Sequence, residues 1–187
     1  MKTKLLATAV LALALVPSAF AHARVSPAVA QAKQLQLFTL AVPTEKENAT
    51  TTKIEFTPPA GFSIDSFQPA PGWQRSVQSS GSGESAVVTK VTWTGGKTPT
   101  GEDSVFGFLA QPDSSKTYTF DVRQTYSDGS VVDWSGPESA DAPAPTIEAK
   151  SSFGGGSSTL GLIALVVAVV ALCVAGLGLV GGKRSLA

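Results

Sequence analysis

Side chains alternate strictly between two faces over residues 118–126, and this pattern limits the chain to a β fold more than any other feature. The residues of one face are Tyr118, Phe120, Val122, Gln124 and Tyr126. A period of two residues is typical of a strand with one buried face. Asp128 and Gly129 follow and predict a tight hairpin turn, with residues 130–134 as the returning strand.

Four earlier segments also show strand patterns, and none has a helical period. They cover residues 35–42, 51–56, 87–93 and 106–110, and Gly95-Gly96 predicts a turn after the third. The intervening sequence is rich in residues typical of sheets and turns, namely Thr, Ser, Val, Gly and Pro. Short strands at this spacing predict an all-β fold, an antiparallel β-sandwich of about seven strands over residues 22–137.

The start of the chain has the three parts of a secretory signal peptide. Lys2 and Lys4 form a basic beginning, residues 5–16 are apolar, and an Ala-Phe-Ala run at 19–21 offers small residues before a cleavage point. We therefore expect residues 1–21 to be a cleaved signal peptide. Cleavage would make His22, the single histidine of the sequence, the first residue of the exported protein.

A second apolar segment lies near the C-terminus. Residues 160–180 carry no charge, and about 20 apolar residues cross a bilayer as a helix. Lys183 and Arg184 follow, which predicts a cytoplasmic C-terminus. The sequence thus predicts a single-pass protein of the cell membrane, with an extracytoplasmic sandwich, a transmembrane helix over 159–182 and a cytoplasmic tail over 183–187.

The segment between sandwich and helix is expected to be a linker. Residues 138–158 run from Pro-Ala repeats into a Gly-Ser stretch, which is a composition of mixed stiffness. One short strand is expected inside it, at residues 146–149.

Composition excludes several classes of function. Lys and Arg number 14 and Asp and Glu also 14, so nothing suggests a nucleic-acid partner. The one cysteine, Cys173, lies in the second apolar segment, and the one methionine is Met1. A blue-copper centre and a zinc finger need cysteine thiolates, and a Ser-His-Asp triad needs a histidine positioned by the fold. We therefore expect a protein that is not an enzyme.

A histidine at the N-terminus offers one metal two nitrogen ligands. The free α-amine and the imidazole Nδ1 of His22 would lie in one chelate ring. Cu(II) prefers nitrogen and oxygen ligands in tetragonal geometry and ranks highest in affinity among the divalent ions of the first transition row. The alternative is that His22 merely happens to follow the cleavage point, so other residues must converge on it.

Glu45 is the first candidate for a carboxylate ligand beside His22. If residues 22–26 pair as a hairpin with residues 35–42, the start of the first strand faces the end of the second, and Glu45 follows that end. Glu102 is a second acidic candidate, at the junction of a loop and a strand. Either side chain could instead be a solvated loop residue. Trp134, at the end of the last sheet strand, is by its type more typical of a core.

The order of the motifs resembles one known family. A histidine follows the signal peptide, and then come VPTEK (42–46), TTKIEF (51–56), PAPGW (69–73), VTWTGG (91–96) and QTYSDGSVVDWSGP (124–137). This arrangement is similar to the YcnI family of membrane-anchored, copper-binding surface domains. The resemblance covers nearly the whole predicted sandwich.

The resemblance implies an immunoglobulin/cupredoxin-like sandwich that holds Cu(II) by a single-histidine brace. It assigns the brace to His22 and places Trp134 beside the metal, and VPTEK supplies Glu45 as the carboxylate. In place of the Gly-Gln/Glu-Phe run frequent in the family, this chain has Gly101-Glu102-Asp103, which leaves Glu102 as an alternative ligand. The resemblance also implies copper acquisition or homeostasis as a metallochaperone, with a copper importer or another copper-handling protein as partner.

Two other classes remain as alternatives. A structural or adhesive surface sandwich would carry His22 without a specific metal. A copper-dependent redox enzyme is disfavoured, because one histidine and no cysteine or methionine in the sandwich would hold Cu(I) poorly. The identity of the first residue of the exported chain distinguishes the copper-binding hypothesis from the two alternatives.

Overall fold

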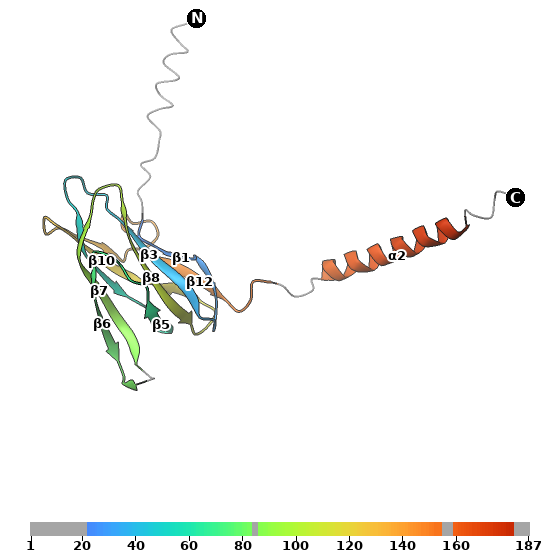
Figure 1. Cartoon of the computed structure of the whole chain (residues 1–187), viewed down its shortest axis with the longest axis horizontal. Coiled ribbons are helices and arrows are strands. Elements are labelled where there is room, and N and C mark those ends of the chain that lie inside the picture. Colours follow the sequence, from blue (N-terminus) through green and yellow to red (C-terminus); the bar gives the residue numbers. More distant parts are fainter. Residues whose placement is uncertain (1–21, 84–85, 155–158, 182–187) are drawn as a thin grey trace, which may run out of the picture. The chain divides into compact units, whose positions relative to one another are not determined.

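The computed structural model describes residues 22–83, 86–154 and 159–181. Its first part is an all-β antiparallel sandwich, as predicted (Figure 1). One sheet contains, in spatial order, β1 (Arg24–Ser26), β3 (Gln36–Pro43), β8 (Asp103–Pro112) and β5 (Phe62–Phe67). The other large sheet contains β11 (Val131–Trp134), β10 (Asp121–Tyr126), β4 (Thr51–Thr57), β7 (Val87–Thr98) and β6 (Gln74–Ser80).

The core lies between these sheets and is built from alternate residues of each strand. From β3 the inward residues are Phe38, Leu40 and Val42, which are fully buried, while Leu37 on the other face is 48% exposed. Aromatic rings join the layers: Phe56 of β4 lies against Phe108 of β8 with 5.5 Å between ring centroids. Such ring pairs add to the stabilisation that burial of apolar area provides.

The alternation over residues 118–126 is divided between two sheets. The five residues of its apolar face are all buried, so the predicted face is confirmed. The prediction of one continuous strand is wrong, because the chain changes sheet at Phe120, between β9 (Thr117–Thr119) and β10. The backbone N–H of Phe120 donates to the carbonyl of Pro145 instead of continuing a ladder.

Gly95-Gly96 does not turn the chain. β7 continues through both glycines to Thr98, and the turn comes after it, around Gly101 with φ of 83°. A Cβ on Gly96 would lie 2.1 Å from the indole ring of Trp73, so the glycine is needed for close packing. The prediction of a turn was wrong because a glycine can serve a tertiary contact as well as a backbone conformation.

The sandwich extends further along the chain than residue 137. A third, small sheet contains β2 (Val29–Gln31), β12 (Thr146–Lys150) and β9. β12 is the short strand expected at 146–149, and Ile147 is 1% exposed within the core. The compact unit ends at Ser151, so residues 138–151 of the predicted linker belong to the folded domain.

A helix, α2 (Thr159–Gly181), lies in a second unit that begins at Ser152. It covers the segment in which the sequence predicts a transmembrane helix. Within the residues that the structure describes, no helix combines the length and hydropathy of a membrane span. The predicted signal peptide (1–21) and cytoplasmic tail (183–187) lie outside the described residues.

Candidate metal site

The hairpin-like pairing of β1 with β3 places His22. The two strands are antiparallel, with Arg24 opposite Ala41 and Ser26 opposite Thr39. This register, continued two residues toward the N-terminus, brings His22 to the level of Pro43. Burial alternates from His22 through β1: Ala23, directly before the strand, is 4% exposed, and His22 is exposed like Arg24.

The carboxylate candidates lie at the same end of the sandwich. β3 pairs with β8 so that Pro43 faces Asp103. Beyond this pair, the N–H of Thr44 donates to the carbonyl of Glu102 at 2.9 Å, and the N–H of Gly101 donates to the carbonyl of Thr44 at 2.9 Å. Glu45 and Glu102 are both exposed. The structure therefore brings the three segments that carry His22, Glu45 and Glu102 to one end of the sheet, whereas the sequence predicted this only for the segments of His22 and Glu45.

The two glutamates lie just outside the strands that their segments continue. Val42 and Thr44 are buried, whereas Glu45, two residues after the end of β3, is exposed, as is His22. Ser104 of β8 is 2% exposed, and Glu102, which directly precedes β8, is exposed. Both carboxylates therefore lie at the surface at this end of the sheet.

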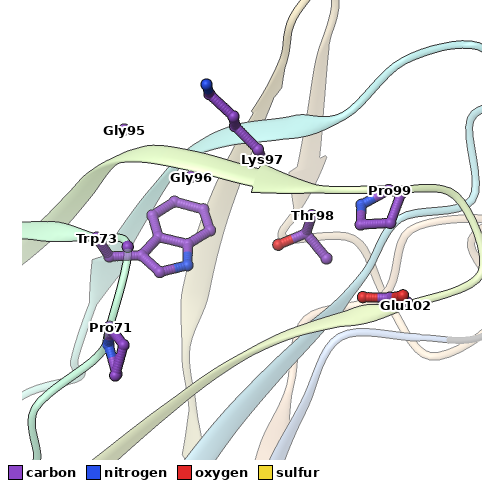
Figure 2. Close-up of a pocket in the computed structure, with 9 residues that line it drawn as sticks. Pro71, Trp73, Gly95, Gly96, Lys97, Thr98, Pro99 and Glu102 are labelled. Carbon is purple, nitrogen blue, oxygen red and sulfur yellow. The ribbon is translucent and has the colours of Figure 1, made fainter.

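Glu102 lines a separate surface depression. The depression has a volume of about 450 Å³ and is bordered by the half-buried ring of Trp73, by Gly96 and by Thr98 (Figure 2). Trp73 is held there by Phe106, with ring centroids 5.1 Å apart and planes at 81°. Glu102 therefore faces this depression between β7 and β8.

The segment that carries Glu45 is fixed by contacts of its neighbour Lys46. The Lys46 ammonium forms an ion pair with Asp128 and donates to the hydroxyl of Ser130 at 2.8 Å. The Lys46 carbonyl accepts from the hydroxyl of Thr100 at 2.6 Å. The hydrogen bond from Lys46 is the main reason why the pKa of the Asp128 carboxyl lies well below its usual range. These contacts involve Lys46 and leave the Glu45 carboxylate at the surface.

Tyr126 contacts the segment that carries Glu45 and Lys46. Its side chain is buried, and its pKa is raised mainly because burial disfavours the phenolate. Hydrogen bonds from the backbone of Glu45 and Lys46 to Tyr126 oppose this effect, and the charge of Glu45 adds to it. Tyr126 and Glu45 are therefore close neighbours.

Trp134 is a core residue with a satisfied polar group. It is 1% exposed and lies opposite Val122 on β10. Its indole Nε1–H donates to the side-chain oxygen of Gln124 at 2.9 Å. The packing and this hydrogen bond give Trp134 a structural role in the core, which does not depend on whether a metal binds beside it.

Gln124 is a buried residue whose importance the sequence reasoning missed. It is fully buried on β10, and its Nε2 donates to the carbonyl of Pro43 at 2.8 Å and to the hydroxyl of Thr51 at 2.7 Å. One signal was available: Gln124 is the one amide in the buried face of the 118–126 alternation. A primary amide at such a position must find partners, because burying it without them is costly.

The donor set is small but fits the proposed metal chemistry. Among the described residues, no group of three or more His, Cys, Asp or Glu side chains is placed to hold a metal ion. A brace does not need such a group, since His22 would supply both the amine and the imidazole nitrogen and one carboxylate would complete the set. Nitrogen and oxygen ligands without thiolate suit Cu(II).

The structure defines an antiparallel β-sandwich with an exposed histidine, His22, two residues before its first strand. The family described as "Domain of unknown function (DUF1775)" matches residues 22–149, which is more than half of the sequence. The chain belongs to this family, and the resemblance to YcnI proteins indicated by its motifs is confirmed.

Two relatives are informative. The chain is 32% identical over 186 residues to the "Copper-binding protein CutI" of Bacillus subtilis (strain 168), covering 89% of each chain. It is also similar to the crystal structure of an uncharacterized protein from Nocardia farcinica with an immunoglobulin-like fold, with a TM-score of 0.57 and 34% identity over 68% of this chain and 97% of that chain. The immunoglobulin-like part of the predicted immunoglobulin/cupredoxin-like fold is thus confirmed.

Proposed function

We propose that this protein binds one Cu(II) ion through a mature N-terminal histidine brace. The ligands are the α-amine and imidazole of His22 and the carboxylate of Glu45. The register of β1 and β3 carries the proposal, because it brings His22 to the level of Pro43, two residues before Glu45. The name of the Bacillus subtilis relative, a copper-binding protein, supports the choice of metal.

The role that follows is copper handling outside the cytoplasm. We propose that residues 1–21 are cleaved as a signal peptide and that the apolar segment 160–180 holds the sandwich at the cell membrane. The family match begins at residue 22, which agrees with a mature chain that starts at His22. The protein would act without catalysis, in copper acquisition or homeostasis as a metallochaperone for a copper importer or another copper-handling protein.

The copper proposal is tested with a chain that begins at His22. Titration with Cu(II) against a competing chelator should give one saturable site. Electron paramagnetic resonance should show type-2 character, since the ligands are nitrogen and oxygen. Intense blue absorption, or binding without saturation at one ion per chain, would contradict the proposal.

The proposed processing and anchoring are tested in the source cell. N-terminal sequencing of the exported protein should read His22 first, and the protein should fractionate with membranes. A variant truncated after Ser151 should be released in soluble form. A mature chain that begins at another residue would remove the brace and leave a surface sandwich without a specific metal.

A further inference from the structure

Buried polar side chains gather at one end of an otherwise apolar core. Within the described residues they are Thr44, Thr51, Ser104 and Gln124. Thr51 pairs with Thr98 on β7, and the hydroxyl of Ser104 donates to that of Thr98 at 2.8 Å. This end of the sandwich also carries His22 and the Pro43–Glu45 segment.

Gln124 is the centre of this group because it joins the two sheets. It lies on β10 in one sheet, and its Nε2 bonds the carbonyl of Pro43 at the end of β3 in the other. The same nitrogen donates to Thr51 on β4, and Thr51 shares a hydrogen bond of 2.6 Å with Thr44. The Gln124 oxygen accepts from Trp134.

Every polar atom of this amide is satisfied. Both N–H directions and the oxygen have partners at 2.7 to 2.9 Å, and no buried side-chain nitrogen or oxygen in the described residues lacks one. An apolar residue of the same size would fill the space without requiring these partners. An amide at this position fixes geometry instead, since each bond is directional and costly to leave unmade.

The bond to Pro43 is the one that matters for the metal ligands. Pro43 lies opposite Asp103 and at the level that the β1 register gives to His22. Thr44, the next residue, receives a second link from Gln124 through Thr51. Glu45 follows directly, so Gln124 holds the chain before Glu45 at two successive residues, Pro43 and Thr44.

We propose that Gln124 is a positioning residue for the copper site. It sets the separation of the two sheets where β3 ends and thereby places the Glu45 carboxylate relative to His22. Trp134 acts in the same network by orienting the Gln124 amide through its indole N–H. This inference rests on the proposed Cu(II) function and adds residues that would contact no metal.

The test compares Gln124→Met with a matched control, Phe62→Leu. Methionine keeps the length of the side chain and removes its hydrogen bonds. Phe62 is a core residue opposite Pro112, at the other end of β8, so its replacement lowers stability without touching the network. Both variants begin at His22.

The first measurement needs no metal. Hydrogen exchange of the backbone N–H groups of Thr44 and Gly101, which bridge β3 and β8, should be faster in Gln124→Met than in Phe62→Leu. Exchange of the Ala149 N–H, bonded to Lys116 elsewhere in the sandwich, should respond alike in both. The second measurement is Cu(II) affinity, expected to fall by about 10- to 100-fold in Gln124→Met with a changed paramagnetic resonance spectrum, and to stay unchanged in Phe62→Leu.

The outcomes separate this inference from the function on which it rests. If the wild type binds Cu(II) and Gln124→Met binds it with the same affinity and spectrum, the positioning role is overturned and the proposed function stands. If the wild type binds no Cu(II), both are overturned. Should Gln124→Met fail to fold, Thr51→Val decides the question, because it removes the link between Gln124 and Thr44 and should give a smaller loss in the same direction.

Discussion

Arg24 and Asp103 form an ion pair with 3.0 Å between Nη2 and Oδ2, although β3 separates their strands. The pair crosses the outer face of the sheet and ties the beginning of β1, two residues after His22, to the beginning of β8. The two side chains are 58% and 30% exposed, so water and salt weaken the attraction.

We expect Arg24→Gln to have a small effect on stability. The free energy of unfolding should fall by less than about 1 kcal/mol, and the difference should shrink at high salt, because the ion pair is solvated. Chemical denaturation at low and high ionic strength measures this. Lys150→Gln, which breaks the similarly exposed pair with Glu148 on β12, is the control. A large loss that persists at high salt would contradict this account of the ion pair.

Trp134→Phe should distinguish a packing role of Trp134 in the core from a position of its ring beside the metal. We expect a loss of about 1–3 kcal/mol in the free energy of unfolding, because part of a buried ring and its hydrogen bond to Gln124 are removed. Cu(II) is paramagnetic and quenches a nearby indole, so the variant should also lose most of the copper-dependent fluorescence quenching. Quenching that persists through Trp73 or Trp93 would show that Trp134 lies in the core away from the metal.

Gly96→Ala should disturb the depression beside Glu102. The added methyl would lie 2.1 Å from the Trp73 ring, and the ring must move or the strand must shift. Overpacking of this kind typically costs about 1–3 kcal/mol. Thermal unfolding should show the loss, and tryptophan emission should shift to the red as Trp73 becomes more exposed. An unchanged melting temperature and emission would contradict the close contact.

Glu45→Gln and Glu102→Gln form a matched pair, since both remove one negative charge from an exposed glutamate at the same end of the sandwich. Glu45→Gln should weaken Cu(II) binding in a competition titration, because a neutral amide oxygen is a poorer ligand than a carboxylate. Glu102→Gln should bind as the wild type does. The reverse result would assign the carboxylate ligand to Glu102.

Local patterns in the sequence predicted the faces of the strands but not how the strands are combined. The alternation that begins at Tyr118 identified five buried residues correctly. It could not show that the chain changes sheet at Phe120, because both strands keep the same phase. Gly96 was misread as a turn because the ring of Trp73, which requires the glycine, is distant in sequence.

Hairpin geometry predicted only part of the candidate site. Pairing of β1 with β3 followed from the order of the segments, and it correctly brought the segments of His22 and Glu45 to one end. The network around Gln124 was not predictable in the same way, because its partners Pro43 and Thr51 lie 81 and 73 residues away in the sequence. Only the presence of an amide in a buried stripe pointed to it.

The α-amine of His22 is the central element of the account, and one extra residue tests it most directly. A chain that starts at His22 is compared with the same chain preceded by a single glycine, which keeps the imidazole but moves the amine out of the chelate ring. The account predicts that the extended chain binds Cu(II) more weakly by orders of magnitude and has a different paramagnetic resonance spectrum. Equal affinity and identical spectra for the two chains would contradict the histidine brace.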